Sequence, residues 1–176
     1  GLKPGDASGV DLAARLAEEA GVAAIAFHPR SAVVGHKGEP AYELVREVVS
    51  RVEVPVIVSG GLDSAEGARR AYEVSGADAI MVARGCFGNP WIFGELTGVR
   101  EASPGPGEIA EELLWVVARA EEHLGERRAS HYLRKFYPWY AEGLGIDRGE
   151  ADEFQRLTDL SEARRMISRA ASAAAS

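Results

Sequence analysis

The sequence has few of the residues that mark secreted, metal-binding or membrane proteins. Cys86 is the only cysteine among 176 residues, which excludes an internal disulfide and a zinc site built from cysteines. No apolar run is long enough to span a bilayer, and no basic, apolar leader is visible at Gly1. The net charge of −7 argues against nucleic-acid binding over the whole surface, but a local basic patch is compatible with it. We expect a cytoplasmic globular protein with no metal site and no membrane partner.

Two kinds of apolar pattern alternate over the first half of the chain. Longer stretches have helical periodicity, with Leu12 and Leu16 on the apolar stripe of the first, and short apolar runs between them are typical of strands. The predicted elements are helices over 10–20, 40–51 and 64–75, and strands over 23–27, 56–58 and 79–82. This alternation indicates βαβ units and a parallel sheet.

The second half of the chain is predicted to be helical. Residues 98–107 contain two prolines and three glycines and are typical of a linker. Beyond them, proline at position 138 predicts a kink or break within one of the helices. The predicted helices cover 108–124, 128–144, 150–157 and 161–171.

Three strands are too few for a closed barrel, although their apolar character requires cover on both sides. A barrel of eight parallel strands needs roughly 200 to 250 residues. We therefore interpret residues 1–98 as the C-terminal part of a (β/α)8 TIM barrel that begins after a missing strand, 99–107 as a linker, and 108–176 as an all-α helical domain. In this chain alone, one strand edge and one face of the sheet are expected to be uncovered. A small three-stranded α/β unit that is complete in itself is the alternative.

An arginine and two glycines follow the third predicted strand. Arg84 and Gly85 come directly after it, and Gly88 lies three residues further on. Glycine lets backbone N–H groups approach an anion closely, and arginine adds a charged contact with two donors. The segment predicts a phosphate-holding turn, with a surface ion pair of Arg84 as the alternative.

The ends of all three strands carry motifs that resemble one known family. The motifs are Phe27-His28-Pro29-Arg30-Ser31, Ser59-Gly60-Gly61-Leu62 after the second strand, Arg84-Gly85 followed by Gly88-Asn89-Pro90-Trp91, and, among the helices, Leu133-Arg134-Lys135-Phe136 and Trp139-Tyr140. Together they resemble the tRNA-dihydrouridine synthases, which are FMN-dependent (β/α)8 barrels with a C-terminal helical domain. The resemblance covers nearly the whole chain.

The resemblance implies a flavin site at the strand ends. A histidine and an arginine follow the first strand where the family keeps them near the flavin, and Ser-Gly-Gly stands in place of the family's Asn-Gly-Asp phosphate loop. Alanine precedes the arginine of the second phosphate turn where the family has glycine, which is tolerable if the backbone there is not left-handed. The implied cofactor-binding residues are His28, Arg30, Ser59, Gly60, Gly61, Ala83, Arg84 and Gly85.

Basic side chains, with aromatic ones beside them, lie along the predicted helix over 128–144 and at its start. This combination suits unstacked RNA bases and phosphates, and the alternative is a solvated face over an aromatic core. The expected RNA-binding residues are Arg127, Arg128, Arg134 and Lys135, with Tyr137, Trp139 and Tyr140 as stacking surface.

The activity implied by the resemblance is the reduction of uridine in tRNA to 5,6-dihydrouridine, with FMN as cofactor and NADPH or NADH as reductant. The family's catalytic cysteine lies on earlier strands, so we expect it upstream of Gly1 and expect this chain alone to be inactive. Cys86 is expected to be a small buried side chain. Two other functions stay open: a flavin-free barrel enzyme acting on a sugar phosphate, and a non-enzymatic RNA-binding remnant. The sequence predicts no oligomeric state.

Overall fold

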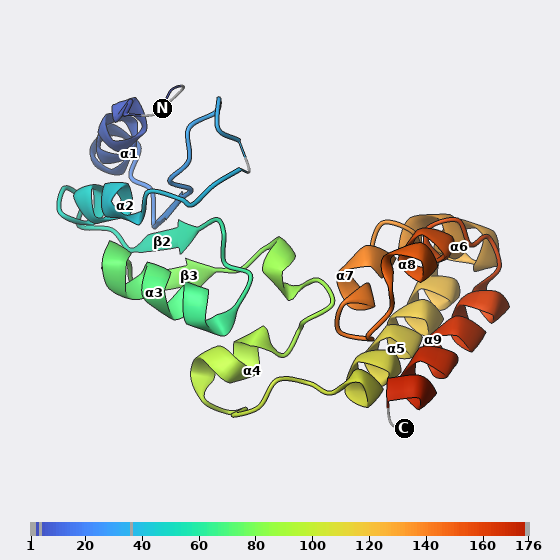
Figure 1. Cartoon of the computed structure of the whole chain (residues 1–176). Coiled ribbons are helices and arrows are strands. Elements are labelled where there is room, and N and C mark those ends of the chain that lie inside the picture. The colour runs from blue at the N-terminus through green and yellow to red at the C-terminus, as the bar shows by residue number, and fades with distance from the viewer. Residues whose placement is uncertain (1–2, 4, 36, 175–176) are drawn as a thin grey trace. The chain divides into compact units, whose positions relative to one another are not determined.

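The structure is a computed structural model that describes residues 3, 5–35 and 37–174 (Figure 1). Backbone contacts divide the chain into two compact units, residues 1–86 and 87–176. By these contacts residues 87–98 belong to the second unit, and the division into functional domains at 99–107 stays a prediction. Gly1, where the barrel part was expected to begin, lies outside the described residues.

The first unit alternates helices with the strands of a parallel sheet, as the sequence predicted. Its elements are α1 (Ser8–Glu19), β1 (Ile25–Phe27), α2 (Tyr42–Val49), β2 (Val56–Ser59), α3 (Ala65–Ser75), β3 (Ala79–Met81) and the 3-10 turn η1 (Arg84–Cys86). The three-stranded sheet has the order β1-β2-β3. Ile25 is in register with Val56, and Ile57 with Ala79.

Local interactions explain where α3 begins and where β2 meets β3. The Ser64 hydroxyl accepts a hydrogen bond of 3.1 Å from the backbone N–H of Gly67, which caps the first turn of α3. Gly76 ends the helix in the left-handed conformation, with φ at +63°. The Asp78 carboxylate accepts a hydrogen bond of 2.8 Å from the N–H of Val56 and so ties the starts of the two strands together.

One face of the sheet is covered by helices and the other is open within the described residues. Val56 and Val58 of β2 are buried against Val45 and Val48 of α2 in one apolar cluster. On the opposite face Met81 is 41% exposed, so the expectation of an uncovered face is confirmed for this chain. The apolar stripe predicted for the first helix does not face this core: Leu12 and Leu16 are exposed, because α1 packs through Val10 and Ala13 instead.

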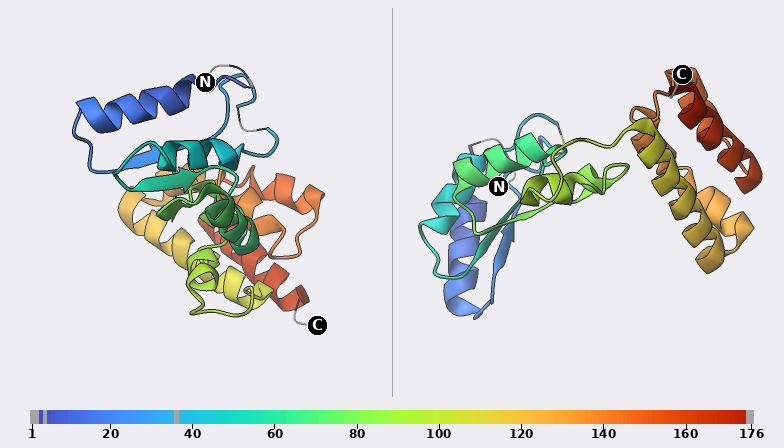
Figure 2. Two further views of the ribbon diagram at one scale, coloured as in Figure 1. Left: turned by 90° about the vertical axis from the view of Figure 1, so that its left-hand side faces the viewer. Right: turned by 90° about the horizontal axis from the view of Figure 1, so that it is seen from below.

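Within its described residues the second unit contains helices as its only regular elements. They are α4 (Ile92–Thr97), α5 (Pro106–Leu124), α6 (Glu126–Leu133), α7 (Tyr137–Ala141), α8 (Arg148–Phe154) and α9 (Leu160–Ala174). The helices α5 and α9 lie side by side in Figures 1 and 2. The predicted break near Pro138 is confirmed, although this proline lies in the first turn of α7, where a missing N–H costs nothing. The short helix α4 was not predicted.

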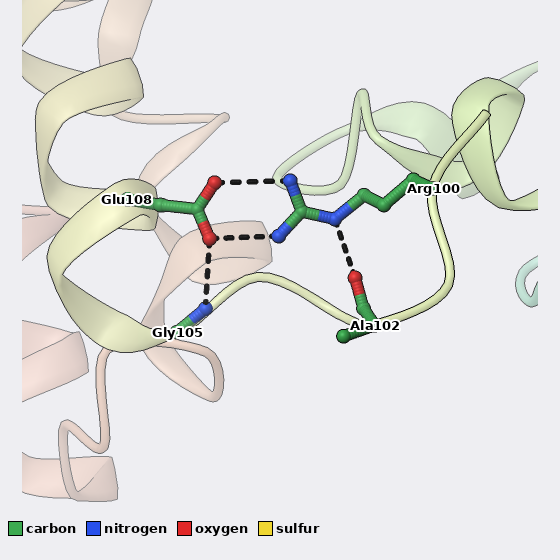
Figure 3. A network of polar contacts seen from close by, with 4 residues as sticks. All are labelled: Arg100, Ala102, Gly105 and Glu108. Carbon is green, nitrogen blue, oxygen red and sulfur yellow. Dashed lines mark hydrogen bonds and ion pairs between the residues drawn. The ribbon is translucent and has the colours of Figure 1, made fainter.

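Arg100 ties the loop between α4 and α5 to both helices, and Figure 3 shows the contacts of its side chain with Ala102 and with Glu108 of α5. Its guanidinium donates two hydrogen bonds, of 2.9 and 2.7 Å, to the two carboxylate oxygens of Glu108 in the first turn of α5, and a third to the carbonyl of Ala102. Its backbone N–H donates to the carbonyl of Gly94 in α4 at 3.1 Å. The bond from Arg100 holds the pKa of the Glu108 carboxyl below its usual value. The loop therefore has a defined path between the two helices.

The core of the second unit contains one hydroxyl group that lacks a partner. The Tyr137 ring is buried edge-on against Phe154 at a centroid distance of 5.2 Å, and its hydroxyl oxygen is buried without a hydrogen-bond partner. Burial raises the pKa of Tyr137 to about 12. The neighbouring Tyr140 is also buried, but its hydroxyl donates a hydrogen bond to the Glu112 carboxylate.

Tyr137→Phe is expected to raise the free energy of unfolding of this unit by about 1 kcal/mol, because it removes a buried polar group that has no partner. Tyr140→Phe is the matched control and should lower it by about 1 kcal/mol, since a buried hydrogen bond is lost. Urea unfolding followed by tryptophan fluorescence measures both. A loss of stability in both variants would contradict the interpretation of Tyr137.

Candidate functional site

The loops after β1 and β2 are packed directly against each other. Gly60 has φ at +99°, and a Cβ added to it would lie 2.5 Å from Nε2 of His28. Gly61 has φ at +70°, and its added Cβ would lie 3.1 Å from Nη2 of Arg30. Both positions favour glycine because φ is positive, and at Gly60 the ring of His28 also leaves no space for a Cβ. The structure brings His28, Arg30, Gly60 and Gly61 together, as the sequence analysis expected of one site.

Arg30 carries a donor that the protein does not use. Its Nη2 donates a hydrogen bond of 2.8 Å to the carbonyl of Gly38, but its Nε is buried without a partner. The backbone N–H of Gly61, an exposed residue, donates to no acceptor within the described part of the chain. The Nε of Arg30 is the buried one, and buried donors are rarely left unpaired in folded proteins, so it calls for an explanation such as a bound anion.

The turn after β3 contacts the loop after β2. A Cβ added to Gly85 would lie 1.9 Å from the carbonyl oxygen of Leu62, so backbone meets backbone here and only glycine fits. Ala83 does not have a positive φ, which satisfies the condition set for alanine at this position. Arg84 is exposed and forms no ion pair with any described residue. The loops after all three strands thus meet at the C-terminal ends of the parallel strands.

Two features of this turn differ from the expectation. Cys86 is half-buried rather than buried, and its thiol donates to the carbonyl of Ala83, with 3.0 Å between sulfur and oxygen. Gly88, predicted to let the backbone approach an anion, instead lies against the backbone of Trp139 within the second unit. Its added Cβ would lie 2.2 Å from the carbonyl oxygen of Trp139. The anion-facing part of the turn is therefore limited to the residues before Phe87.

Acidic and basic groups are mixed around Arg30. One pocket of the first unit is lined by Arg30, Arg70, Glu39, Glu43 and Asp63, together with Tyr42 and Gly61. A second pocket is lined by Arg30 on its other side, with His28 and Ser31. No group of three or more His, Cys, Asp or Glu side chains that could hold a metal is found among the described residues. Among the described side chains at this place, the buried donor without a partner is the Nε of Arg30.

Sequence reasoning missed Tyr42, which contacts the same loop. Its hydroxyl donates a hydrogen bond of 2.8 Å to the carbonyl of Gly60, across 18 positions of the sequence. Burial is the main cause that raises the pKa of Tyr42, and the nearby Arg30 opposes it. A tyrosine at the start of a helix gives no local signal for such a contact, so only the folded structure reveals it.

In the second unit the basic residues on α6 and directly after it divide into two groups. Arg127, Arg128 and Lys135 are exposed. Nζ of Lys135 lies 4.1 Å from the ring centroid of Tyr132 and 5.0 Å from that of Phe136. Arg134, in contrast, is half-buried and its Nε donates a hydrogen bond of 2.9 Å to the carbonyl of Leu157.

The expected stacking surface is wrong for two of its three aromatic residues. Tyr137 and Tyr140 are only 2% and 5% exposed, because their rings fill the core between the helices. Trp139 is exposed, as predicted. The sequence analysis missed Phe87 and Tyr132, both also exposed; the Phe87 ring lies edge-on to Trp139 at 5.8 Å.

No helix among the described residues has the length and apolar character needed to cross a membrane.

Comparison with known proteins agrees with these motifs. The family model described as dihydrouridine synthase matches residues 6–175. The tRNA-dihydrouridine synthase B of Pseudomonas aeruginosa is 36% identical over 152 residues, which are 83% of this chain and 46% of that protein. The protein of the same name from Shewanella oneidensis is 33% identical over 145 residues, 80% of this chain and 45% of its own length. The chain therefore spans about half the length of these relatives, and over nearly all of its own length it belongs to the dihydrouridine synthase family.

Proposed function

We propose that the protein is a flavin-dependent tRNA-dihydrouridine synthase, in which the first unit holds the phosphate end of FMN and the second unit contacts tRNA. Membership of the family supports the activity. The observation that carries the assignment of the site is the meeting of three strand ends around unpaired donors, those of Arg30 and Gly61, beside the exposed Arg84.

We further propose that the sheet is the C-terminal part of a (β/α)8 barrel and that residues 108–176 are its helical domain. Three parallel strands in sequence order, with α2 and α3 connecting them, are consistent with this architecture. In such barrels functional residues lie at the C-terminal ends of the strands, where His28, Gly60 and Arg84 are found.

The residues fit an anionic phosphate group. The buried Nε of Arg30 and the free N–H of Gly61 are donors without partners, and Arg84 adds a positive charge that no described acidic residue neutralises. Ser59, Ala83 and Gly85 complete the proposed site through their backbone, and His28 lies beside it. When bound, FMN supplies the hydride chemistry that saturates the 5,6 double bond of uracil, with NADPH or NADH as the reductant.

The chain's own residues then have positioning and binding roles. Hydrogen bonds from charged donors to a phosphate are stronger than those between neutral groups, so the two arginines are expected to supply most of the affinity for the anion. The glycines let the backbone lie close to it. A uridine inside folded tRNA must leave its stack to reach a flavin, which requires contacts to the surrounding RNA. We assign these contacts to Arg127, Arg128, Arg134 and Lys135.

The test uses a chimera in which this chain replaces the matching segment of the Pseudomonas aeruginosa relative. The chimera is expressed in a bacterial strain that lacks all dihydrouridine synthases, and the dihydrouridine content of tRNA is measured by mass spectrometry. We expect the chimera to be a yellow, FMN-containing protein that restores dihydrouridine. Expression of this chain alone in the same strain is the comparison. A soluble chimera that retains FMN but forms no dihydrouridine would contradict the proposed activity.

The RNA assignment predicts different effects for two neighbouring residues. Lys135→Ala should weaken tRNA binding by the chimera and reduce the slope of log affinity against log salt concentration by roughly 0.7 to 0.9, as for one lost phosphate contact. Arg134→Ala should also lower the stability of the second unit, because its hydrogen bond to Leu157 is lost. Filter binding over a series of salt concentrations measures the slope.

The control for charge is Arg119→Ala, which removes a cation already paired with Glu122. It should leave the salt slope unchanged. If Lys135→Ala also left the slope unchanged, the surface around Lys135 would be a solvated surface over the aromatic core rather than an RNA contact.

A further inference from the structure

The loop that carries Gly60 and Gly61 is held by Tyr42, a residue that the sequence analysis did not assign to the anion site. The Tyr42 hydroxyl, at the start of α2, donates a hydrogen bond of 2.8 Å to the carbonyl oxygen of Gly60. The segment before α2 is held to the loop after β1, because the N–H of Ala41 donates to the carbonyl of Pro29 at 2.9 Å, and this places Tyr42 beside Gly60. The segment also places Pro40 against Gly61.

Because the peptide group is planar, this hydrogen bond also restrains the N–H of the next residue. The carbonyl of Gly60 and the N–H of Gly61 belong to the same planar peptide group, which is trans, so the two bonds point in opposite directions. A partner that fixes the Gly60 carbonyl therefore also fixes the direction of the Gly61 N–H. That N–H belongs to an exposed residue and donates to no acceptor in the described part of the chain, so it is open to a ligand.

Glycine at both positions makes such a restraint necessary. With φ at +99° and +70°, Gly60 and Gly61 occupy conformations that other residues rarely adopt, and glycine can leave them at little cost. Without the bond to Tyr42, rotation of this peptide would turn the Gly61 N–H away. Tyr42 is half-buried, and burial raises the pKa of its hydroxyl above the ordinary value.

We infer that Tyr42 is a positioning residue that holds the Gly60–Gly61 peptide with the Gly61 N–H directed at a phosphate group. The inference rests on the proposed function, because it takes the phosphate of FMN as the anion. Tyr42 does not touch the ligand in this assignment. It acts through the backbone of Gly60, which distinguishes its role from those of Arg30 and Arg84.

The experiment compares Tyr42→Phe with Tyr72→Phe in the full chain labelled with ¹⁵N-glycine. Tyr72 is an exposed tyrosine on α3 and controls for the loss of a hydroxyl group. Without ligand, Tyr42→Phe should shift the amide resonances of Gly60 and Gly61, and Tyr72→Phe should leave both in place. Unchanged resonances in Tyr42→Phe would overturn the inference.

The second arm titrates each variant with FMN and with riboflavin, which lacks the phosphate, and follows flavin fluorescence. Tyr42→Phe should weaken FMN binding roughly two- to tenfold, as expected for one hydrogen bond, and leave riboflavin binding unchanged. An equal loss for both flavins would assign Tyr42 a general structural role and overturn the inference, as would no loss for either. If the unsubstituted chain bound neither flavin, the proposed cofactor site would fail for this chain and the phosphate contact inferred for Gly61 would fail with it, whereas the amide resonances would still test separately whether Tyr42 orients the peptide.

Discussion

Gly88→Ala is expected to lower the free energy of unfolding of the second unit by about 2 to 5 kcal/mol. Gly88 has φ at +70°, a conformation that costs a residue with a Cβ roughly 1 to 2 kcal/mol. The added Cβ would also lie 2.2 Å from the carbonyl oxygen of Trp139, and overpacking of this kind costs roughly 1 to 3 kcal/mol more. Because the obstacle is backbone, it cannot be relieved by the rotation of a side chain.

Gly98→Ala provides the matched control for this prediction. Gly98 has nearly the same φ, +73°, but no heavy atom lies within 4 Å of its added Cβ. It should therefore cost only the conformational part, roughly 1 to 2 kcal/mol. All three tryptophans lie after Phe87, so urea unfolding followed by tryptophan fluorescence reports on this unit. Equal losses of stability in the two variants would show that the contact between the added Cβ and the carbonyl of Trp139 does not affect stability.

Arg84→Ala is expected to lower the affinity of the chimera for FMN about ten- to a hundredfold. The substitution removes a hydrogen bond from a charged donor to the proposed phosphate, which contributes roughly 1.5 to 3 kcal/mol. Arg84 is exposed and forms no ion pair among the described residues, so its removal leaves no unpaired acid behind and should not unfold the turn. Flavin fluorescence titration of the apoprotein measures the affinity.

Cys86→Ala is the control within the same turn. Its thiol contacts only the carbonyl of Ala83 among the described polar groups, so its loss should leave FMN affinity and dihydrouridine formation nearly unchanged. A larger loss of FMN affinity in Cys86→Ala than in Arg84→Ala would refute the assignment of Arg84 as a phosphate-binding residue.

The sequence predicted the elements of the first unit because each depends on nearby residues. Apolar periodicity located α2 and all three strands, and the hydroxyl of Ser64 located the start of α3. Motifs at the strand ends were sufficient to identify the family, since each is a short contiguous segment. The break near Pro138 follows from the covalent structure of proline itself.

The sequence alone did not determine which face of an element is buried or which distant groups meet. The stripe of Leu12 and Leu16 has the pattern of a core face but is exposed, and Tyr137 and Tyr140 were expected at the surface but fill the core. Burial depends on which element packs against each helix, and periodicity only shows that a helix has two different faces.

What the sequence by itself determined is the order of helices and strands, the glycine and arginine positions at the strand ends, and the family. What only the tertiary structure decided is the pairing of groups far apart in the chain: Tyr42 with Gly60, and Arg134 with the carbonyl of Leu157, 23 positions away. Hydrogen bonds across such separations have no local signature, because either partner could satisfy its donor or acceptor with water until the packing of helices and sheet brings the two together.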